Sequence, residues 1–261
     1  MERVIRRSAH AKLNVSLHVL GRRDDGYHDI ESVIVPVSLA DEMTFRAAPE
    51  LRLTVRGDVE VPADEGNLVV IAAEALAAAC GIEAGADVEL DKRIPAAAGL
   101  GGGSADAAAT LLALNELWGC GLEGDDLLEL AAALGSDVPA LLPGGPVLVG
   151  GRGEIVEPAE VEPSWWVLLP QPFALRTSDV YRWWDEAAGP RDPAGVNDLE
   201  PPVVARHPEV AAAKDRLLAE GARRAMLCGS GPTVAGLADD EQEARRIAAS
   251  LPGAIAVSAP P

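Results

Sequence analysis

The stretch 95–108, PAAAGLGGGSADAA, has the residue types of an anion cradle. Its glycines let backbone N–H groups approach a ligand closely and allow positive φ. An alanine-rich apolar segment follows directly, and the helix that it predicts leaves its first N–H groups unpaired and partially positive. That combination binds phosphate groups. The alternative, on pattern alone, is a structural turn in front of a helix.

The spacing of this loop differs from that of two common phosphate loops. A P-loop carries Lys and then Ser or Thr after its last glycine, whereas Ser104 and Ala105 follow Gly103 here. The dinucleotide fingerprint has a third glycine or alanine three residues past its second, where this chain has Ser104 after Gly101. A flexible linker is disfavoured, because Pro95 bounds the loop and apolar residues recur at helical spacing after it.

Other polar residues stand where they could act on a ligand. Lys92 and Arg93 place two cations immediately before the loop. Asp137 lies in the short turn GSDVP, where by itself it is most simply a turn or capping residue. Residues 21–28 form a loop of turn residues, and loops carry functional side chains more often than strands do. The turn 229–233 is either an ordinary tight turn or a second ligand-facing loop.

The strands and helices that must position these residues begin with a β-rich N-terminal segment. Alternating apolar residues predict its strands, and a later alanine-rich helix ends at Gly81. In order, the pattern predicts strands at 13–20 and 30–39, two shorter strands within 42–56, a helix at 67–80, a strand at 88–90, a helix after the glycine loop and a helix at 125–134.

A dense run of Gly and Pro at 143–163 predicts a change of domain. We therefore expect an N-terminal domain at 1–150 and a C-terminal domain at 151–261. The second domain resembles a split β-α-β layout, an antiparallel sheet covered on one face by helices. Its predicted elements are a strand at 165–169, a helix at 178–186, a Pro-rich loop, a helix at 208–220, strands at 225–228 and 234–237, a helix at 240–251 and a strand at 255–257.

Composition limits the class of protein and of partner. The 261 residues are 48% hydrophobic and 24% charged, which is typical of a globular chain of one large or two modest domains. A formal net charge of −19 argues against a nucleic-acid or anionic-membrane surface, since both need Lys and Arg. A phosphate ligand stays compatible, because backbone amides and a few local cations can hold it.

The cysteines and histidines indicate neither a zinc site nor a disulfide framework. Cys80, Cys120 and Cys228 are widely spaced and odd in number, a usage that suits a reducing cytoplasm. The four histidines have no metal-ligand spacing with the cysteines. No run of 18 apolar residues occurs.

Three segments resemble, in this order, the three motifs of the GHMP small-molecule kinases. They are AKLN at 11–14, the glycine loop at 95–108 and CGSGPT at 228–233. Further features are similar to the branch that phosphorylates 4-diphosphocytidyl-2-C-methyl-D-erythritol: the GLGGGS form of the loop, GRRDDGYH at 21–28, GSDVP at 135–139 and NDLE at 197–200.

The resemblance implies a kinase of the non-mevalonate isoprenoid pathway that transfers the γ-phosphoryl group of ATP to the 2-hydroxyl of the methylerythritol moiety. The implied fold is the two-domain α+β GHMP kinase fold. Its N-terminal domain would be like ribosomal protein S5 domain 2, and its C-terminal domain would be ferredoxin-like. The implied location is cytoplasmic, and the implied partner is this small molecule, with no nucleic acid or membrane.

Two catalytic residues follow from matching positions. Asp137 matches the family's catalytic aspartate, and Lys12 matches the lysine paired with it. A carboxylate can accept the proton that a hydroxyl loses as it attacks phosphorus, and an ammonium group stabilises the developing charge. The simpler alternatives are a turn residue for Asp137 and a solvated strand-end residue for Lys12.

The resemblance also assigns the two ligands. Tyr27 and His28 match positions that hold cytosine by stacking and hydrogen bonding, against core packing as the alternative for a tyrosine. The other substrate positions are Asn14, Thr177 and Tyr181. The ATP positions are Pro95, Gly99, Leu100, Gly101, Gly102, Gly103, Ser104, Asn67 and Lys92. No side chain is assigned to a metal, and we expect Mg²⁺ to arrive with ATP, held by its phosphates and by water.

Two other functions stay open. One is a GHMP kinase for mevalonate, homoserine or a sugar, which the Tyr27-His28 loop and the triple glycine disfavour. The other is a non-catalytic regulator of the same fold that binds ligands, which the presence of both Lys12 and Asp137 disfavours.

Overall fold

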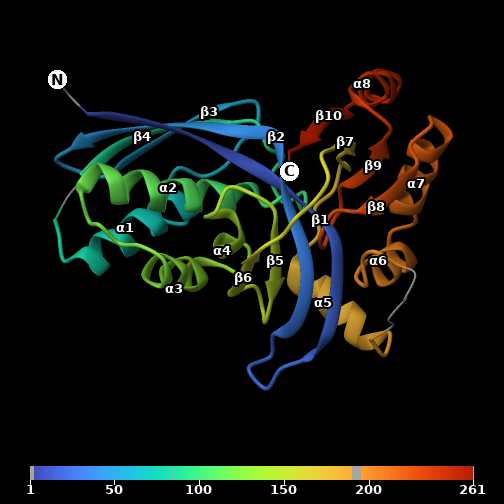
Figure 1. Cartoon of the computed structure of the whole chain (residues 1–261), viewed down its shortest axis with the longest axis horizontal. Helices are drawn as coiled ribbons and strands as arrows, with labels where there is room; N and C mark the ends of the chain where they lie inside the picture. Colours follow the sequence, from blue (N-terminus) through green and yellow to red (C-terminus); the bar gives the residue numbers. More distant parts are fainter. Residues whose placement is uncertain (1–2, 84, 190–194, 261) are drawn as a thin grey trace. The chain divides into compact units, whose positions relative to one another are not determined.

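The computed structural model describes residues 3–83, 85–189 and 195–260 (Figure 1). Its strands are β1 (Val4–Arg22), β2 (His28–Ala48), β3 (Arg52–Gly57), β4 (Gly85–Lys92), β5 (Val147–Gly150), β6 (Ile155–Pro158), β7 (Ser164–Leu169), β8 (Arg224–Leu227), β9 (Val234–Ala238) and β10 (Ile255–Ala259). Its helices are α1 (Leu68–Cys80), α2 (Gly102–Trp118), α3 (Asp125–Leu134), α4 (Val138–Leu141), α5 (Thr177–Glu186), α6 (Glu200–Arg206), α7 (Pro208–Ala219) and α8 (Glu241–Ser250).

The chain forms two compact units that are interleaved in the sequence. Unit 1 comprises Met1–Ala11, Leu39–Ala96 and Gly101–Gly144, and unit 2 comprises Lys12–Ser38, Ala97–Leu100 and Gly145–Pro261. The long strands β1 and β2 each contribute residues to both units, as does the glycine loop. The predicted domain boundary near residue 150 stays a prediction. The two compact units are each made of several separate segments, so they do not divide the chain at one residue.

Unit 1 packs helices against one face of a twisted group of strands (Figure 1). Strand β4 pairs antiparallel with β2 and parallel with β3. Along β4, Ala86, Val88 and Leu90 are buried while the acidic residues between them are not, so only one face contributes to the core. The apolar residues of α1 and α2 fill that core, for example Leu76 and Leu111.

Unit 2 contains an antiparallel sheet in the order β10-β7-β9-β8. Its first strand in the sequence, β7, lies inside the sheet between the last strand and the third. This is the order of the ferredoxin-like layout, so that prediction is confirmed. Helices α7 and α8 pack on the sheet and bury Leu217 and Ile247 in its core. In the same unit, β5 pairs with β2 and with β6.

The sequence patterns were wrong about the first two strands. β1 begins at Val4 and not near residue 13, and β2 continues without a break where two strands had been predicted. Polar residues interrupt the alternation in both strands but are satisfied across the pair, as where the Ser8 hydroxyl donates to Glu42 at 3.0 Å. In β1 and β2, a polar residue that breaks the apolar alternation can therefore bond to the neighbouring strand, and it does not end its own strand.

Four short elements were missed, namely two strands that form a hairpin and two helices. The hairpin β5–β6 falls in the Gly- and Pro-rich run, where a turn is closed by the Gly153 N–H donating to the Gly150 carbonyl at 3.1 Å. Helix α6 falls in the predicted Pro-rich loop, because its prolines occupy the first turn, where no helical N–H is needed. Helix α4 follows Asp137 directly. In contrast, helix α1 and its end at Gly81, which has φ 62°, are as predicted.

Cys80 and Cys120 form a disulfide, with a Cα–Cα distance of 5.8 Å. The expectation of reduced cysteines is therefore wrong for this pair. The reason lies in the packing of α1 along α2, which brings Cys80 at the end of α1 close to Cys120, two residues past the end of α2. Cys228 is a free thiol, and its burial raises its pKa to about 12.

Among the residues that the structure describes, no helix combines the length and the apolar composition that a membrane span requires.

Reduction of the disulfide should lower the free energy of unfolding by about 2–4 kcal/mol, because it frees a long loop in the unfolded chain. The measurement is the urea midpoint by circular dichroism with and without a phosphine reductant. The double variant Cys80→Ser, Cys120→Ser is the control and should not respond to the reductant. Identical midpoints for the oxidised and reduced wild-type chain would contradict the prediction.

Candidate functional site

The glycine loop presents backbone N–H groups at the start of α2. Gly101 precedes the helix with φ 70°, and no side chain caps the helix. The Ala105 N–H donates to the Gly101 carbonyl at 2.8 Å, which begins the helical ladder. The N–H groups of Gly102, Gly103 and Ser104 come before that bond and point out of the helix end, where a phosphate can accept from them.

Gly102, the first residue of α2, packs against the buried side chains of Ile94 and Lys92 in unit 1. A Cβ placed on Gly102 would lie 2.9 Å from Ile94 Cγ2 and 3.0 Å from Lys92 Nζ. Any side chain at this position would push the first turn of α2 away from Lys92. The glycine therefore brings the backbone close to a buried ammonium group.

In unit 2 the three sequence motifs meet. Gly99 has φ 77°, and a Cβ on it would overlap the carbonyl oxygen of Cys228. The Thr233 N–H donates to the Ala98 carbonyl at 3.3 Å, and the Lys12 N–H donates to the Leu100 carbonyl at 2.9 Å. The glycine loop is thus held between the first motif and the third.

Lys12 and Asn14 form a buried polar pair beside this junction. The Lys12 ammonium donates to Asn14 Oδ1 at 2.6 Å, and Asn14 Nδ2 donates to the Ser32 hydroxyl at 2.8 Å. A Cβ on Gly229 would lie 3.0 Å from both Lys12 Nζ and Asn14 Oδ1. Lys12 is only 4% exposed, so the alternative of a solvated strand-end lysine is wrong.

The segment NDLE holds the third motif in place. Asn197 Nδ2 donates to the carbonyls of Leu227 and Gly229 at 3.0 and 2.8 Å. The Leu227 N–H donates to Glu200 Oε2 at 2.8 Å. Asp198 Oδ2 accepts from the Val19 N–H at 2.9 Å. Sequence reasoning noted this segment without a role, and its role in the structure is to fix a backbone turn.

Asp137 lies in unit 1, at the entry to α4. Its side chain makes no capping hydrogen bond to that helix, although capping was the simplest alternative for this residue. Helix α4 is only four residues long and is buried through Val138 and Ala140. The aspartate is therefore fixed at the start of a packed turn.

Two residues of unit 2 that are predicted to bind the substrate, His28 and Tyr181, lie on β2 and on α5. His28 is buried, and its Nε2 lies 2.8 Å from Asp185 Oδ1. The His28 ring stacks on Tyr181, with ring centroids 4.8 Å apart. The structure thus brings His28 and Tyr181 together, and it adds Asp185, which sequence reasoning missed.

Tyr27 and Thr177 are not part of that contact. Tyr27 is half exposed, so core packing is excluded as its role, and the Arg152 guanidinium lies 5.0 Å from its ring centroid. The Thr177 hydroxyl lies 3.0 Å from that of Ser230, in the turn of the third motif. Ser230 was part of the turn singled out in the sequence, whereas Arg152 carried no signal there, because it lies far from Tyr27 along the chain.

Lys92 is not free to contact a nucleotide through its ammonium group. It is 3% exposed and forms ion pairs with Asp41 and with Asp106 Oδ2, the latter at 2.8 Å. Asp106 Oδ1 is buried and has no partner among the described residues. One ammonium cannot neutralise two carboxylates, and burial, reinforced by the charge of Asp41, raises the pKa of Asp106 to about 7.

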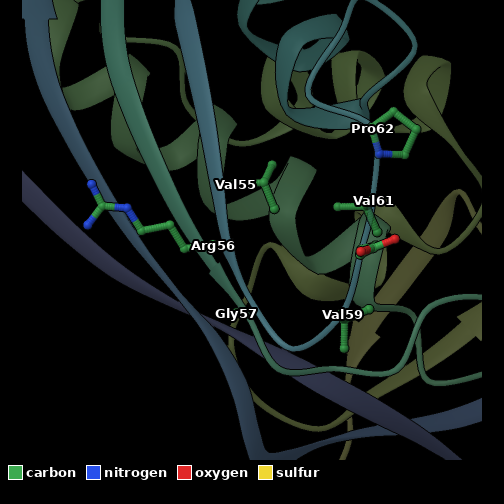
Figure 2. Close-up of a pocket in the computed structure, with 7 residues that line it drawn as sticks. Val55, Arg56, Gly57, Val59, Val61 and Pro62 are labelled. Atoms are coloured by element: carbon green, nitrogen blue, oxygen red, sulfur yellow. The ribbon is translucent and has the colours of Figure 1, made fainter.

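Asn67 caps α1 and shapes a neighbouring pocket. Its Oδ1 accepts from the Val69 N–H at 2.9 Å, and its Nδ2 donates to the Pro62 carbonyl at 2.6 Å. Pro62 lies at one end of an open cavity of about 500 Å³ in unit 1 (Figure 2). The cavity is lined by Val55, Arg56, Gly57, Val59, Glu60, Val61 and Pro62.

Comparison with known proteins identifies the family. Residues 67–145 match the GHMP kinases N terminal domain, and residues 184–256 match GHMP kinases C terminal. A protein of Pelotomaculum thermopropionicum named 4-diphosphocytidyl-2-C-methyl-D-erythritol kinase is 46% identical, over 94% of this chain and 93% of its own. The chain belongs to this family of GHMP kinases.

Solved structures agree with membership in the 4-diphosphocytidyl-2-C-methyl-D-erythritol kinase family. A crystal structure of 4-(cytidine 5'-diphospho)-2C-methyl-D-erythritol kinase matches with a TM-score of 0.85 and 34% identity, over 98% of this chain and all of that one. Homoserine kinase from Cytophaga hutchinsonii matches with a TM-score of 0.71 at 22% identity, over 100% of this chain and 95% of that one, and shows the shared fold alone. The predicted fold class is confirmed.

The charge of Asp106 should make stability depend on pH. Its pKa rises from 3.8 to about 7 on folding, so the folded chain keeps a proton that the unfolded chain loses. The stability contributed below about pH 4 is therefore lost progressively as the pH rises to about 7. Asp106→Asn should raise the free energy of unfolding at pH 8 by about 1–4 kcal/mol and change it little at pH 4.

Urea denaturation at pH 4, 6 and 8 measures this effect. Asp91→Asn is the matched control, because Asp91 is a partly exposed carboxylate beside the same lysine and pairs with Arg93. The same change in stability at pH 4 and pH 8 for Asp106→Asn would contradict the assignment.

Proposed function

We propose that this chain transfers the γ-phosphoryl group of ATP to the 2-hydroxyl of 4-diphosphocytidyl-2-C-methyl-D-erythritol, in the non-mevalonate isoprenoid pathway. The observation that carries the proposal is the meeting of the three kinase motifs in unit 2, at Lys12, Leu100 and Gly229. Identity to the Pelotomaculum relative over nearly the whole chain supports it. The resemblance also supports a cytoplasmic location, and the net charge of −19 favours a small-molecule partner over a nucleic acid.

For ATP, we propose two parts of unit 1. The N–H groups at 102–104 would hold the phosphates, and the cavity at 55–62 would take the adenine against its valine side chains. Gly57 at its edge pairs with Lys92, which leads into the glycine loop, so both parts are fixed to one strand pair. Asn67 would act by holding the Pro62 carbonyl at the cavity.

Mg²⁺ would arrive with ATP and supply positive charge to the transferring phosphoryl group. Among the described residues, no group of three or more His, Cys, Asp or Glu side chains could hold a metal ion. Ser104 offers a hydroxyl at the helix start, and the phosphates and water would supply the remaining ligands.

For the acceptor, we propose that unit 2 binds the cytidyl group. Tyr27 and Tyr181 would present ring faces to the cytosine, and His28 would bind its polar edge. Asn14, held by Lys12 and Ser32, would contact the erythritol end. Thr177, beside Ser230, would contact the rest of the substrate.

The proposed chemistry needs one proton transfer. The 2-hydroxyl oxygen attacks the γ-phosphorus, its proton passes to the Asp137 carboxylate, and ADP leaves. Lys12 would stabilise negative charge on the attacking oxygen. Both roles rest on the family resemblance, and variants test them directly.

An ATP-consumption assay tests the function. We expect turnover with 4-diphosphocytidyl-2-C-methyl-D-erythritol and a product that carries the new phosphate on the 2-hydroxyl, located by phosphorus NMR. Homoserine, mevalonate and a sugar serve as alternative acceptors. Turnover of one of these without turnover of the cytidyl compound would overturn the proposal, and binding without turnover of any acceptor would favour a regulator.

Asp137→Asn should lower kcat by about 10²- to 10⁴-fold and leave the binding of both ligands nearly unchanged, because it removes the proton acceptor and little volume. Stopped-flow turnover and calorimetric titration separate the two effects. Asp126→Asn, an exposed carboxylate at the start of α3, is the control. Near-normal kcat in Asp137→Asn would refute the role.

A further inference from the structure

The ring of His28 is held on three sides by residues of α5. Asp185 Oδ1 lies 2.8 Å from Nε2, the ring of Tyr181 stacks on one face, and Trp184 meets the ring at 89° with centroids 5.6 Å apart. Tyr181 and Asp185 are four residues apart, so they share one face of the helix. In Figure 1, α5 runs beside the β1–β2 hairpin that carries His28.

The contact with Asp185 decides which ring nitrogen carries the proton. An ionised carboxylate only accepts hydrogen bonds, so a 2.8 Å contact requires that Nε2 be the donor. Arg22 Nη1 lies 3.7 Å from the other oxygen, Oδ2, so each carboxylate oxygen of Asp185 faces a nitrogen. In the neutral imidazole the proton on Nε2 leaves Nδ1 as an acceptor.

The Nδ1 atom of His28 has no hydrogen-bond partner within the described part of the chain. A flip of the ring would break the bond to Asp185, and the rings of Tyr181 and Trp184 confine the plane in which it could turn. The donor Nε2 and the acceptor Nδ1 of His28 are therefore fixed in position before a ligand binds.

We propose that Asp185 is a positioning residue that fixes His28 as an acceptor at Nδ1, and that this acceptor selects cytosine over uracil. The 4-amino group of cytosine donates a hydrogen bond, whereas uracil has a carbonyl oxygen at the same position. Two acceptors would face each other with uracil, and the bound base would cover Nδ1 without offering it a donor. This inference rests on the proposed function, since it concerns the base of that substrate.

Asp185→Asn tests the inference. An amide can accept from Nε2–H or donate to a bare Nε2, so both tautomers of His28 become accessible. The ratio of kcat/KM for the cytidyl substrate to that for its uridyl analogue should fall about 5- to 100-fold. Asp179→Asn is the matched control, because Asp179 lies on the same helix and pairs with Arg182. The control should keep the wild-type ratio.

Nitrogen NMR of the imidazole rings gives a second readout that a merely structural role would not move. With only four histidines, His28 can be assigned by comparison with His28→Gln. In the complex with cytidine diphosphate, we expect a protonated Nε2 and a bare Nδ1 in the wild-type chain, and a mixture of tautomers in Asp185→Asn.

The outcomes separate this inference from the proposed function. An unchanged base preference in a folded Asp185→Asn chain, or a wild-type His28 protonated at Nδ1 in the complex, would overturn the inference alone. Absence of turnover of the cytidyl substrate by the wild-type chain would overturn the function instead. Circular dichroism of each variant confirms that it is folded.

Discussion

Backbone packs directly on backbone where Gly99 meets the turn of Cys228, and the arrangement of unit 2 depends on this approach. No Cβ fits at Gly99, and one at Gly229 would crowd Lys12 and Asn14. Because side chains are excluded, the chain passes close enough for Lys12 and Thr233 to bond the glycine loop through their N–H groups. Two glycine turns thus fix a lysine and an asparagine that come from a distant strand.

Around this junction the two buried asparagine side chains are satisfied, while Thr233 Oγ1 and Asp198 Oδ1 form no hydrogen bond with the described residues. Asn14 and Asn197 use both ends of their amides, which is the usual condition for burying one. Asp106 is different, since Lys92 already pairs with Asp41 and leaves one carboxylate oxygen bare. A proton is the simplest means by which the folded chain removes that excess charge.

The sequence predicted those parts of the fold that depend on short-range pattern. Helix α1, its end at Gly81 and the presence of the four strands β7 to β10 follow from periodicity and turn residues. The lengths of β1 and β2 could not be predicted in this way, because the polar residues of each strand are satisfied by residues distant in the sequence. Helix α6 was hidden by prolines, which are tolerated in a first helical turn.

In the candidate site, too, contiguous motifs could be predicted from the sequence, whereas contacts between distant residues could not. The glycine loop was visible because it is contiguous, and the third motif was visible as a turn. Lys92 was expected at the nucleotide, but only folding reveals Asp41 and Asp106 on either side of its ammonium group. Asp185 had no signal at all, since it is separated from His28 by 157 positions and stands among other acidic residues.

The disulfide bears on how the protein is handled. Cys80 ends a 13-residue helix whose other end, about 20 Å away, is capped by Asn67 at the cavity. Chains recovered from reducing and from oxidising conditions would differ by one covalent bond in the layer of helices that follows the glycine loop. Two preparations of identical sequence would then be chemically distinct proteins, and their properties can be compared only after their thiols have been counted.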